Sequence, residues 1–207
     1  MDPRELASYG PVIPVIVIDR LEDAVPMAKA LVAGGVRVLE VTLRTAAGLP
    51  AIQAIARDVP QAIVGAGTVR SAEDVHAAHA AGAKFIVSPG YTRAVGDACK
   101  SLGVALLPGV STASEAMRAN DDGYSFLKLF PATAVGGIPL LKALAGPLAD
   151  IAFCPTGGIT PETAPQYLAL PNVKVVGGSW LTPADAMKSG DWARITELAR
   201  QASAIRA

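Results

Sequence analysis

The sequence has few of the groups that usually bind metals, nucleic acids or membranes. Two of its 207 residues are histidine, two are cysteine, and aromatic residues make up 5%. Lysine plus arginine equals aspartate plus glutamate at 18 each, so no net basic charge attracts nucleic acid or an anionic bilayer. The apolar run Val12–Ile18 is far too short to span a bilayer and contains Pro14. These features argue against nucleic acid and membranes as main partners.

The scarce cysteines and histidines also argue against a metal centre. Cys99 and Cys154 lack metal-ligand spacing, and His76 and His79 lie three residues apart on a segment that predicts a solvent-facing helix. A single possible disulfide gives little support for secretion, and the polar residues 1–10 do not form a signal peptide. We therefore expect reduced thiols, no cofactor and a cytoplasmic location.

Short runs rich in β-branched residues recur at intervals of 20 to 26 residues. Stretches rich in alanine and leucine, with helical spacing, lie between them. We expect strands to begin near Val12, Val36, Ala62, Lys84, Val104, Ser125, Asp150 and Val173. We expect helices over residues 21–33, 47–58, 71–81, 91–101, 111–120, 136–145, 160–169 and 182–204.

This alternation predicts an α/β fold with a parallel sheet. Eight similar βα units without a linker favour closure of that sheet into a barrel. We predict that residues 1–207 form a single-domain TIM (β/α)8 barrel, with a short N-terminal helix over residues 3–9 at one end. An open doubly wound sheet is the alternative, but its glycine fingerprint is missing from the first βα turn, Ile18–Leu21.

Lys128 lies in an apolar segment, Tyr124–Ala132, that predicts a buried strand. Removal of a lysine from water favours the neutral amine, which is a nucleophile toward carbonyl carbon. A lysine that extends its ammonium group from the strand end to solvent is the structural alternative. Chemistry in such barrels belongs at the carboxyl ends of the strands. Of the seven lysines, Lys128 alone is placed within a strand near that end, which favours a catalytic role.

Every second residue of one segment in the second predicted strand is Val38, Glu40, Thr42 and Arg44. If the strand stays extended over this length, all four side chains point to one face, with Glu40 and Arg44 nearest the mouth. Glu40 is suited to proton transfer, and the planar guanidinium group of Arg44 is suited to a carboxylate. A structural Glu40–Arg44 ion pair, or a bond from Arg44 to another loop, is the alternative.

Glycine pairs end the seventh and eighth predicted strands, at Gly157-Gly158 and Gly177-Gly178. In barrels of this kind phosphate usually binds there, held by backbone N–H groups. Thr68 and Thr156 place hydroxyl groups at the mouth, with capping of the next helix as the alternative role. The sequence therefore favours a phosphate site at these strand ends.

Five segments together match one enzyme family, in the same order along the chain. They are Val38–Arg44, Gly65–Thr68, Lys128–Ala132, Cys154–Ile159 and Gly177–Trp180. From about residue 11 to its C-terminus, the sequence resembles the bacterial 2-keto-3-deoxy-6-phosphogluconate (KDPG) aldolases. The related 4-hydroxy-2-oxoglutarate (KHG) aldolases share these motifs.

The resemblance implies a metal-free class I aldolase of carbohydrate metabolism, in the Entner–Doudoroff pathway, that forms a homotrimer. Such an enzyme reversibly cleaves KDPG (2-dehydro-3-deoxy-6-phosphogluconate) to pyruvate and glyceraldehyde 3-phosphate. By motif position, Lys128 forms the Schiff base and Glu40 is the acid and base. The pyruvyl part is bound by Arg44, Thr68 and Thr156, with Phe130 against the imine. The phosphate is bound by Gly157, Gly158, Gly178 and Ser179.

The chain departs from the family pattern at two positions. Leu129 stands where an aromatic residue often follows the lysine, and Thr133 stands where an acidic residue is common. These departures concern the pocket wall.

Three other functions compete with KDPG cleavage. The first is KHG cleavage to pyruvate and glyoxylate, alone or as a second activity of one enzyme. The second is a phosphosugar isomerase or epimerase, with Glu40 as the base and Lys128 as an electrostatic group. The third is a barrel that only binds a phosphorylated metabolite.

Overall fold

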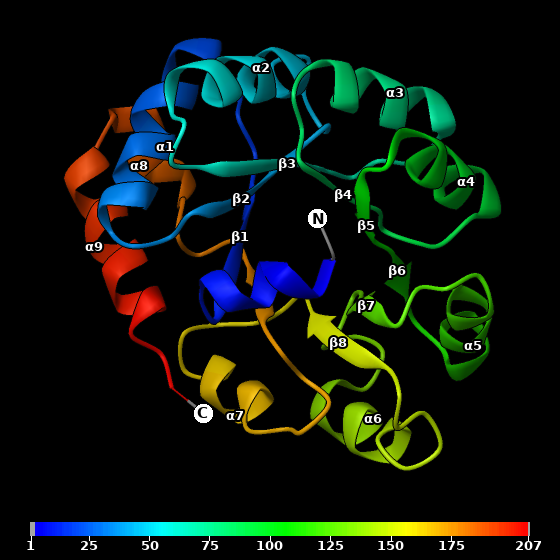
Figure 1. Ribbon diagram of the computed structural model, residues 1–207. Helices are drawn as coiled ribbons and strands as arrows, with labels where there is room; N and C mark the ends of the chain where they lie inside the picture. Colours follow the sequence, from blue (N-terminus) through cyan, green and yellow to red (C-terminus); the bar gives the residue numbers. More distant parts are fainter. Residues whose placement is uncertain (1–2, 207) are drawn as a thin grey trace.

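The computed structural model describes residues 3–206 and confirms an α/β fold (Figure 1). The strands are β1 (Val12–Ile16), β2 (Val38–Thr42), β3 (Ile63–Gly67), β4 (Phe85–Val87), β5 (Ala105–Leu107), β6 (Gly109–Val110), β7 (Phe126–Leu129), β8 (Ala152–Pro155) and β9 (Val176–Gly178). The α-helices are α1 (Ala24–Ala33), α2 (Gly48–Asp58), α3 (Ala72–Ala80), α4 (Arg93–Leu102), α5 (Ala113–Asp121), α6 (Gly137–Leu144), α7 (Ala164–Leu168), α8 (Ala184–Ser189) and α9 (Trp192–Ser203). Two short 3₁₀ helices are η1 (Pro3–Tyr9) and η2 (Leu21–Asp23).

The paired strands are parallel, and the sheet curls so that the helices lie around its outside (Figure 1). Hydrogen bonds join six strands in the order β5-β4-β3-β2-β1-β9 and three in the order β6-β7-β8. β5 and β6 are two segments of one predicted strand, because Pro108 between them has no N–H group for the ladder. Two isolated parallel bridges, Phe153–Val173 and Thr156–Gly177, place β8 and the residue after it beside β9 and the residues just before it.

Side chains alternate between the inside of the curled sheet and the layer under the helices, as the strand period of two requires. On β7, Phe126 belongs to the inner apolar cluster, whereas Leu127 and Leu129 pack toward the helices. The inner cluster consists of Leu6, Ile13, Val38, Phe85, Val87, Ala105, Leu107, Phe126, Ala152, Cys154 and Val175. On β2 and β7 the apolar inner residue precedes the polar one, so the polar groups lie toward the carboxyl ends.

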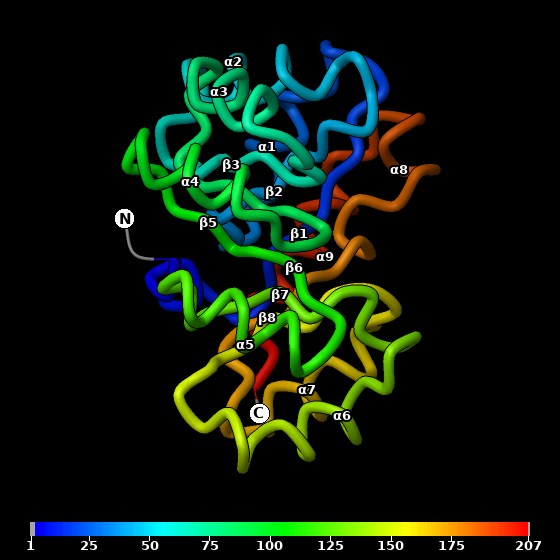
Figure 2. Tube along the Cα trace, turned by 90° about the vertical axis from the view of Figure 1, so that its right-hand side faces the viewer, coloured from blue at the N-terminus to red at the C-terminus, as the bar shows by residue number. Residues whose placement is uncertain are grey.

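The helix η1 covers the amino ends of the strands. Leu6 is 1% exposed and packs within the inner cluster. The Arg4 guanidinium group donates hydrogen bonds to Ser125 Oγ at 2.9 Å and to the carbonyl oxygen of Asp150 at 3.2 Å. Figure 2 shows η1 at the left of the strands and α8 at the right. The predicted short helix over residues 3–9 is thus confirmed, in 3₁₀ form.

Most predicted helices agree with the structure to within about three residues at each end, and two differ more clearly. The predicted helix over residues 160–169 is α-helical only from Ala164, because hydrogen bonds between Thr160 and Thr163 hold the preceding residues in a turn. The predicted helix over residues 182–204 is two helices. Gly190, with φ of +69°, ends α8, and the Asp191 carboxylate then caps α9 by accepting a bond from the Arg194 N–H. Within residues 3–206, none of the helices combines the length and apolar character needed to cross a bilayer.

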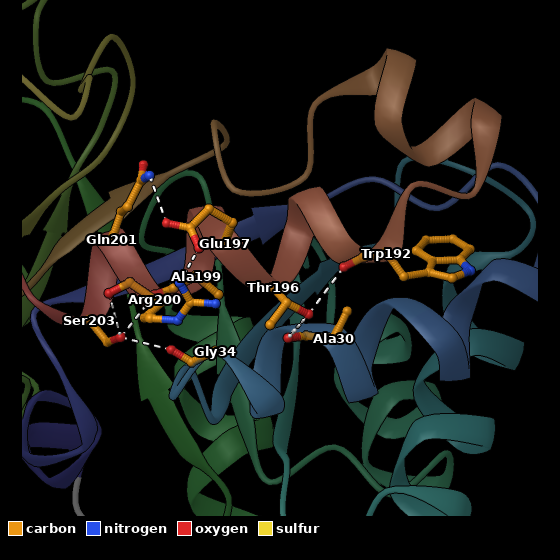
Figure 3. A network of polar contacts seen from close by, with 9 residues as sticks. All are labelled: Ala30, Gly34, Trp192, Thr196, Glu197, Ala199, Arg200, Gln201 and Ser203. Carbon is orange, nitrogen blue, oxygen red and sulfur yellow. Dashed lines mark hydrogen bonds and ion pairs between the residues drawn. The ribbon is translucent and has the colours of Figure 1, made fainter.

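The last helix, α9, packs closely along α1. Figure 3 shows Thr196 and Ser203 of α9 bound to the backbone of the α1 region. Thr196 donates to the Ala30 carbonyl oxygen at 3.1 Å, and Ser203 donates to the Gly34 carbonyl oxygen at 2.8 Å. A Cβ atom on Gly34 would lie 2.5 Å from the Thr196 carbonyl oxygen. Gly34 therefore permits the close approach of the two helices.

We predict that Gly34→Ala lowers the free energy of unfolding by about 1–3 kcal/mol, because backbone atoms of α9 must shift to admit the methyl group. Urea unfolding followed by circular dichroism measures this difference. Gly146→Ala is the matched control, since a Cβ atom there meets nothing within 4 Å. Equal stabilities of the two variants would contradict the close packing.

Candidate active site

Lys128 is the buried polar residue around which the site is built. It lies on β7, one residue before the strand ends, and is 4% exposed. Its backbone N–H donates to the Pro108 carbonyl oxygen at 2.8 Å, which fixes the strand beside β6. Its amine therefore lies inside the curled sheet near the carboxyl ends of the strands, as predicted, and does not extend into solvent.

Glu40 on β2 faces the same interior and pairs with Lys128. Lys128 Nζ donates to Glu40 Oε1 at 3.1 Å, and the two side chains are only 5% and 3% exposed. The Phe130 ring centroid lies 5.3 Å from the same amine. Removing one partner of such a buried pair costs about 3–5 kcal/mol, because the other is left without compensation. The amine and the carboxylate thus lie in contact with each other and almost out of reach of solvent.

Arg44 reaches the mouth by a different path from the predicted one. β2 ends at Thr42, whose hydroxyl donates to the Ile16 carbonyl oxygen, and Arg44 follows in a turn. The condition that the strand stays extended as far as Arg44 is therefore not met, and the alternative of a bond from Arg44 to another loop is the one found. Arg44 Nε instead donates to Thr68 Oγ1 at 3.1 Å, whereas the partner of Glu40 is Lys128.

Thr68 follows β3 with a φ of +60°, and no other non-glycine residue among residues 3–206 has a positive φ. This conformation costs a β-branched residue about 1–3 kcal/mol, so the surrounding contacts must enforce it. The backbone N–H of Leu43 donates to the Gly67 carbonyl oxygen at 2.8 Å and ties the two loops together. The strained turn thereby holds the Thr68 hydroxyl beside Arg44.

Thr156 and the glycines after it form the other side of the mouth. Thr156 is 5% exposed and directly follows β8. Gly157 and Gly158 have φ values of +100° and +79°, a region open to glycine. The Ala132 N–H donates to the Thr156 carbonyl oxygen at 2.8 Å, which joins this turn to the end of β7.

A cavity of about 200 Å³ opens at these strand ends. Its lining residues are Val15, Arg44, Phe130, Thr156, Gly157, Gly158, Ile159, Gly177, Gly178 and Ser179. Seven of the predicted site residues line it directly. Lys128 adjoins it through Phe130, and Thr68 through Arg44. Glu40 follows behind Lys128, its hydrogen-bond partner. The structure thus brings the predicted site residues together at one end of the sheet.

Three lining residues were not predicted as site residues, namely Val15, Ile159 and Gly177. Gly177 and Ile159 occur in the quoted motifs, and Val15 shares parity with the inner residue Ile13. The motifs and the strand period pointed to these three residues, but only the register between the strands shows that they line the same cavity. A larger hollow of about 450 Å³ lies beside the amino ends of β5 and β7, and none of the predicted site residues lines it.

The family model of KDPG and KHG aldolase matches residues 4–198, which is most of the chain. The chain belongs to the KDPG and KHG aldolase family. This result confirms the resemblance inferred from the five motifs. As a member of that family, the protein is an aldolase and therefore a lyase.

Relatives in this family are similar over nearly their whole length. The chain is 57% identical to 2-dehydro-3-deoxy-phosphogluconate aldolase of Pseudoalteromonas atlantica, over 97% of this chain and 94% of the relative. It is 56% identical to KHG/KDPG aldolase of Escherichia coli K12, over 96% and 93%. A crystal structure of KDPG aldolase from Legionella pneumophila, with pyruvate captured as a covalent carbinolamine intermediate, superposes with a TM-score of 0.96 at 47% identity, covering 99% of each chain.

The two departures from the family pattern lie in different surroundings. Leu129 is 1% exposed and packs toward the helices, so it faces away from the cavity. Thr133 lies against the glycine turn, since a Cβ atom on Gly158 would be 2.7 Å from Thr133 Cβ. Of the two, only Thr133 adjoins the cavity.

Among residues 3–206, no three histidine, cysteine, aspartate or glutamate side chains gather as metal ligands would. His76 and His79 are exposed on α3, as predicted. Both cysteines are unpaired and buried. Burial raises the pKa of the Cys99 thiol to about 12. Burial also raises the pKa of the Cys154 thiol to about 12, although Lys128 nearby acts in the opposite direction.

We predict that neither thiol reacts with Ellman's reagent in the folded protein at pH 8, because both are buried and remain protonated well below pH 12. Two equivalents should react after denaturation in guanidinium chloride. The Cys99→Ser variant should release one equivalent, which assigns the signal. Rapid labelling of Cys154 in the folded protein would contradict the enclosed interior.

Proposed function

We propose that the protein is a class I aldolase that reversibly cleaves KDPG to pyruvate and glyceraldehyde 3-phosphate. The buried Lys128–Glu40 pair at the carboxyl ends of the strands carries this proposal. A nucleophilic amine and a proton-transfer group within contact of each other are the two requirements of Schiff-base aldol chemistry. Relatives named 2-dehydro-3-deoxy-phosphogluconate aldolase, at 50% to 57% identity, support it.

The reaction begins at Lys128. Its neutral amine attacks the C2 carbonyl carbon of the substrate to give a carbinolamine. Protonation of the carbinolamine hydroxyl group and its loss as water then give a protonated imine. No metal is required, because the positive imine nitrogen is itself the electron sink. The captured carbinolamine of pyruvate in the Legionella pneumophila enzyme supports this intermediate.

Glu40 moves the protons of the cleavage step. Its carboxylate removes the C4 hydroxyl proton, directly or through water, and the electrons of the C3–C4 bond pass to the imine nitrogen. The aldehyde leaves, and the enamine is protonated at C3 to give the pyruvyl imine. Water then hydrolyses the imine and restores the Lys128 amine. The 3.1 Å contact between Nζ and Oε1 supports this role, since a substrate bound on Nζ would be held close to the carboxylate.

The remaining site residues orient the substrate. Arg44 and Thr68, joined by their hydrogen bond, bind the substrate carboxylate together with Thr156. Phe130 packs against the imine, which its ring position beside Lys128 Nζ supports. Backbone N–H groups and the Ser179 hydroxyl hold the phosphate at Gly157, Gly158, Gly178 and Ser179. Binding energy from this distant phosphate helps to orient the bond that breaks.

Several wider properties follow from the family resemblance. We infer one closed (β/α)8 barrel and a single domain, which the bridges between β8 and the β9 segment support. We also infer a homotrimer in the cytoplasm that acts in the Entner–Doudoroff pathway.

The phosphorylated substrate is favoured over KHG. The glycine turns offer N–H donors that suit a phosphate, and several relatives carry the KDPG name alone. We predict a higher kcat/KM for KDPG than for KHG when pyruvate release is followed with lactate dehydrogenase. A higher kcat/KM for KHG would reverse the assignment.

Borohydride reduction in the presence of pyruvate should attach a pyruvyl group to Lys128, because reduction makes the imine stable. Mass spectrometry of peptides identifies the modified lysine. Lys142→Met, which removes a helical lysine, should be labelled like the original protein, and Lys128→Met should not. Active enzyme with an unmodified Lys128 would refute the Schiff base and favour an isomerase or epimerase.

Glu40→Gln should lower kcat for KDPG cleavage by about 10²-fold or more, the usual contribution of a general acid or base. The amide cannot accept the C4 hydroxyl proton, whereas the Lys128 amine remains available. Labelling with pyruvate and borohydride should therefore persist in this variant. Unchanged kcat would remove Glu40 from proton transfer.

A further inference from the structure

Gly67, at the end of β3, lies beside the carboxylate of Glu40 on the neighbouring strand. β2 and β3 pair in parallel, with Glu40 opposite Gly65 and Thr42 opposite Gly67. A Cβ atom on Gly67 would lie 2.6 Å from Glu40 Cγ and 2.8 Å from Cδ, and it would overlap Oε1. Glu40 therefore occupies the space that a side chain at residue 67 would need.

The backbone at Gly67 does not itself require glycine. Its φ is outside the left-handed region, in contrast to Gly157 and Gly158. Strand geometry of this kind accepts alanine. Glycine is needed here because any side chain would overlap Glu40, since real Cβ atoms essentially never approach heavy atoms below 3.0 Å.

The displaced atom would be the one that contacts Lys128. Glu40 Oε1 accepts the hydrogen bond from Nζ, and Glu40 is 2% exposed. A methyl group at residue 67 must displace this carboxylate. The shift changes the distance from the carboxylate to the C3 and C4 positions of a substrate bound on Lys128.

We propose that Gly67 is a positioning residue for the aldol reaction, which acts by leaving the space that sets the place of the Glu40 carboxylate. This inference rests on the proposed acid and base role of Glu40. The inference predicts different effects on imine formation and on the proton-transfer steps that follow it. Imine formation at Lys128 needs the amine and a proton for the departing water, which solvent can supply, whereas bond cleavage and C3 protonation need the carboxylate in register.

The matched control is Gly65, two residues earlier on the same face of β3. A Cβ atom there would lie 2.5 Å from the ring of Phe85, an apolar residue of the inner cluster. Gly65→Ala therefore adds the same methyl group to the same strand but presses on a ring instead of on Glu40. The comparison separates loss of stability from loss of proton transfer.

The experiment measures four variants: Gly67→Ala, Gly65→Ala, Glu40→Ala and the double variant Glu40→Ala/Gly67→Ala. For each, kcat and KM for KDPG, exchange of the pyruvate methyl protons in D2O, borohydride labelling and thermal unfolding are recorded. Gly67→Ala should lower kcat and proton exchange by about 10²-fold, because a displacement near 1 Å has effects of this size. Its borohydride labelling should persist, and Gly65→Ala should keep kcat within a few-fold of the original value.

The double variant tests the mechanism even if Gly67→Ala folds poorly. With the Glu40 side chain removed, the added methyl group has room, so Gly67→Ala should change neither the melting temperature nor the residual kcat of Glu40→Ala. Equal losses of kcat in Gly67→Ala and Gly65→Ala would overturn the inference. So would a further loss in the double variant as large as that caused by Gly67→Ala alone. Failure of the original protein to be labelled at Lys128 would instead refute the proposed function.

Discussion

The contact between Lys128 and Glu40 is the most demanding interaction that the strands have to hold in place. Two ionisable groups are kept almost out of water at 3.1 Å from each other. Desolvation of both groups is unfavourable by several kcal/mol each, roughly, and their mutual attraction only offsets it when the geometry is good. A fold that retains such a pair needs rigid strands on both sides of it, and β2 and β7 provide them.

The curled parallel sheet explains how residues 88 positions apart meet. Neither strand needs a special local conformation, because each presents every second side chain to the interior. Apolar residues such as Val38 and Phe126 fill the space toward the amino ends. The next inward position on each strand is then the first with room for polar chemistry. The site is therefore a consequence of the strand period combined with parallel order.

Much of this arrangement can be predicted from the sequence because it depends on local rules. The period of two places Glu40 and Lys128 on the inner face, and the direction of the strands places them toward the mouth. The number of repeats predicts the parallel α/β architecture. Glycine pairs and the threonines beside them mark the turns that line the cavity.

Other features could not be predicted because they depend on contacts between loops and strands far apart in the sequence. The end of β2 at Thr42 and the bond from Arg44 to Thr68 follow from the way two loops meet, which no pattern within Val38–Arg44 reveals. The space beside Gly67 is defined by the register of β3 against β2. The division of the last helix required knowledge of the left-handed conformation at Gly190.

The covering of the amino ends by η1 has a consequence for the order of events during turnover. Leu6 and the inner cluster lie beneath Lys128 and Glu40, so a molecule held at Lys128 can depart only through the mouth. Under the proposed function, the phosphate-bearing aldehyde lies nearest that opening and the pyruvyl group remains attached below it. Under the proposed function, the products therefore leave in a fixed order, with the aldehyde first and pyruvate last. In the reverse direction, the same geometry makes pyruvate the first substrate to enter.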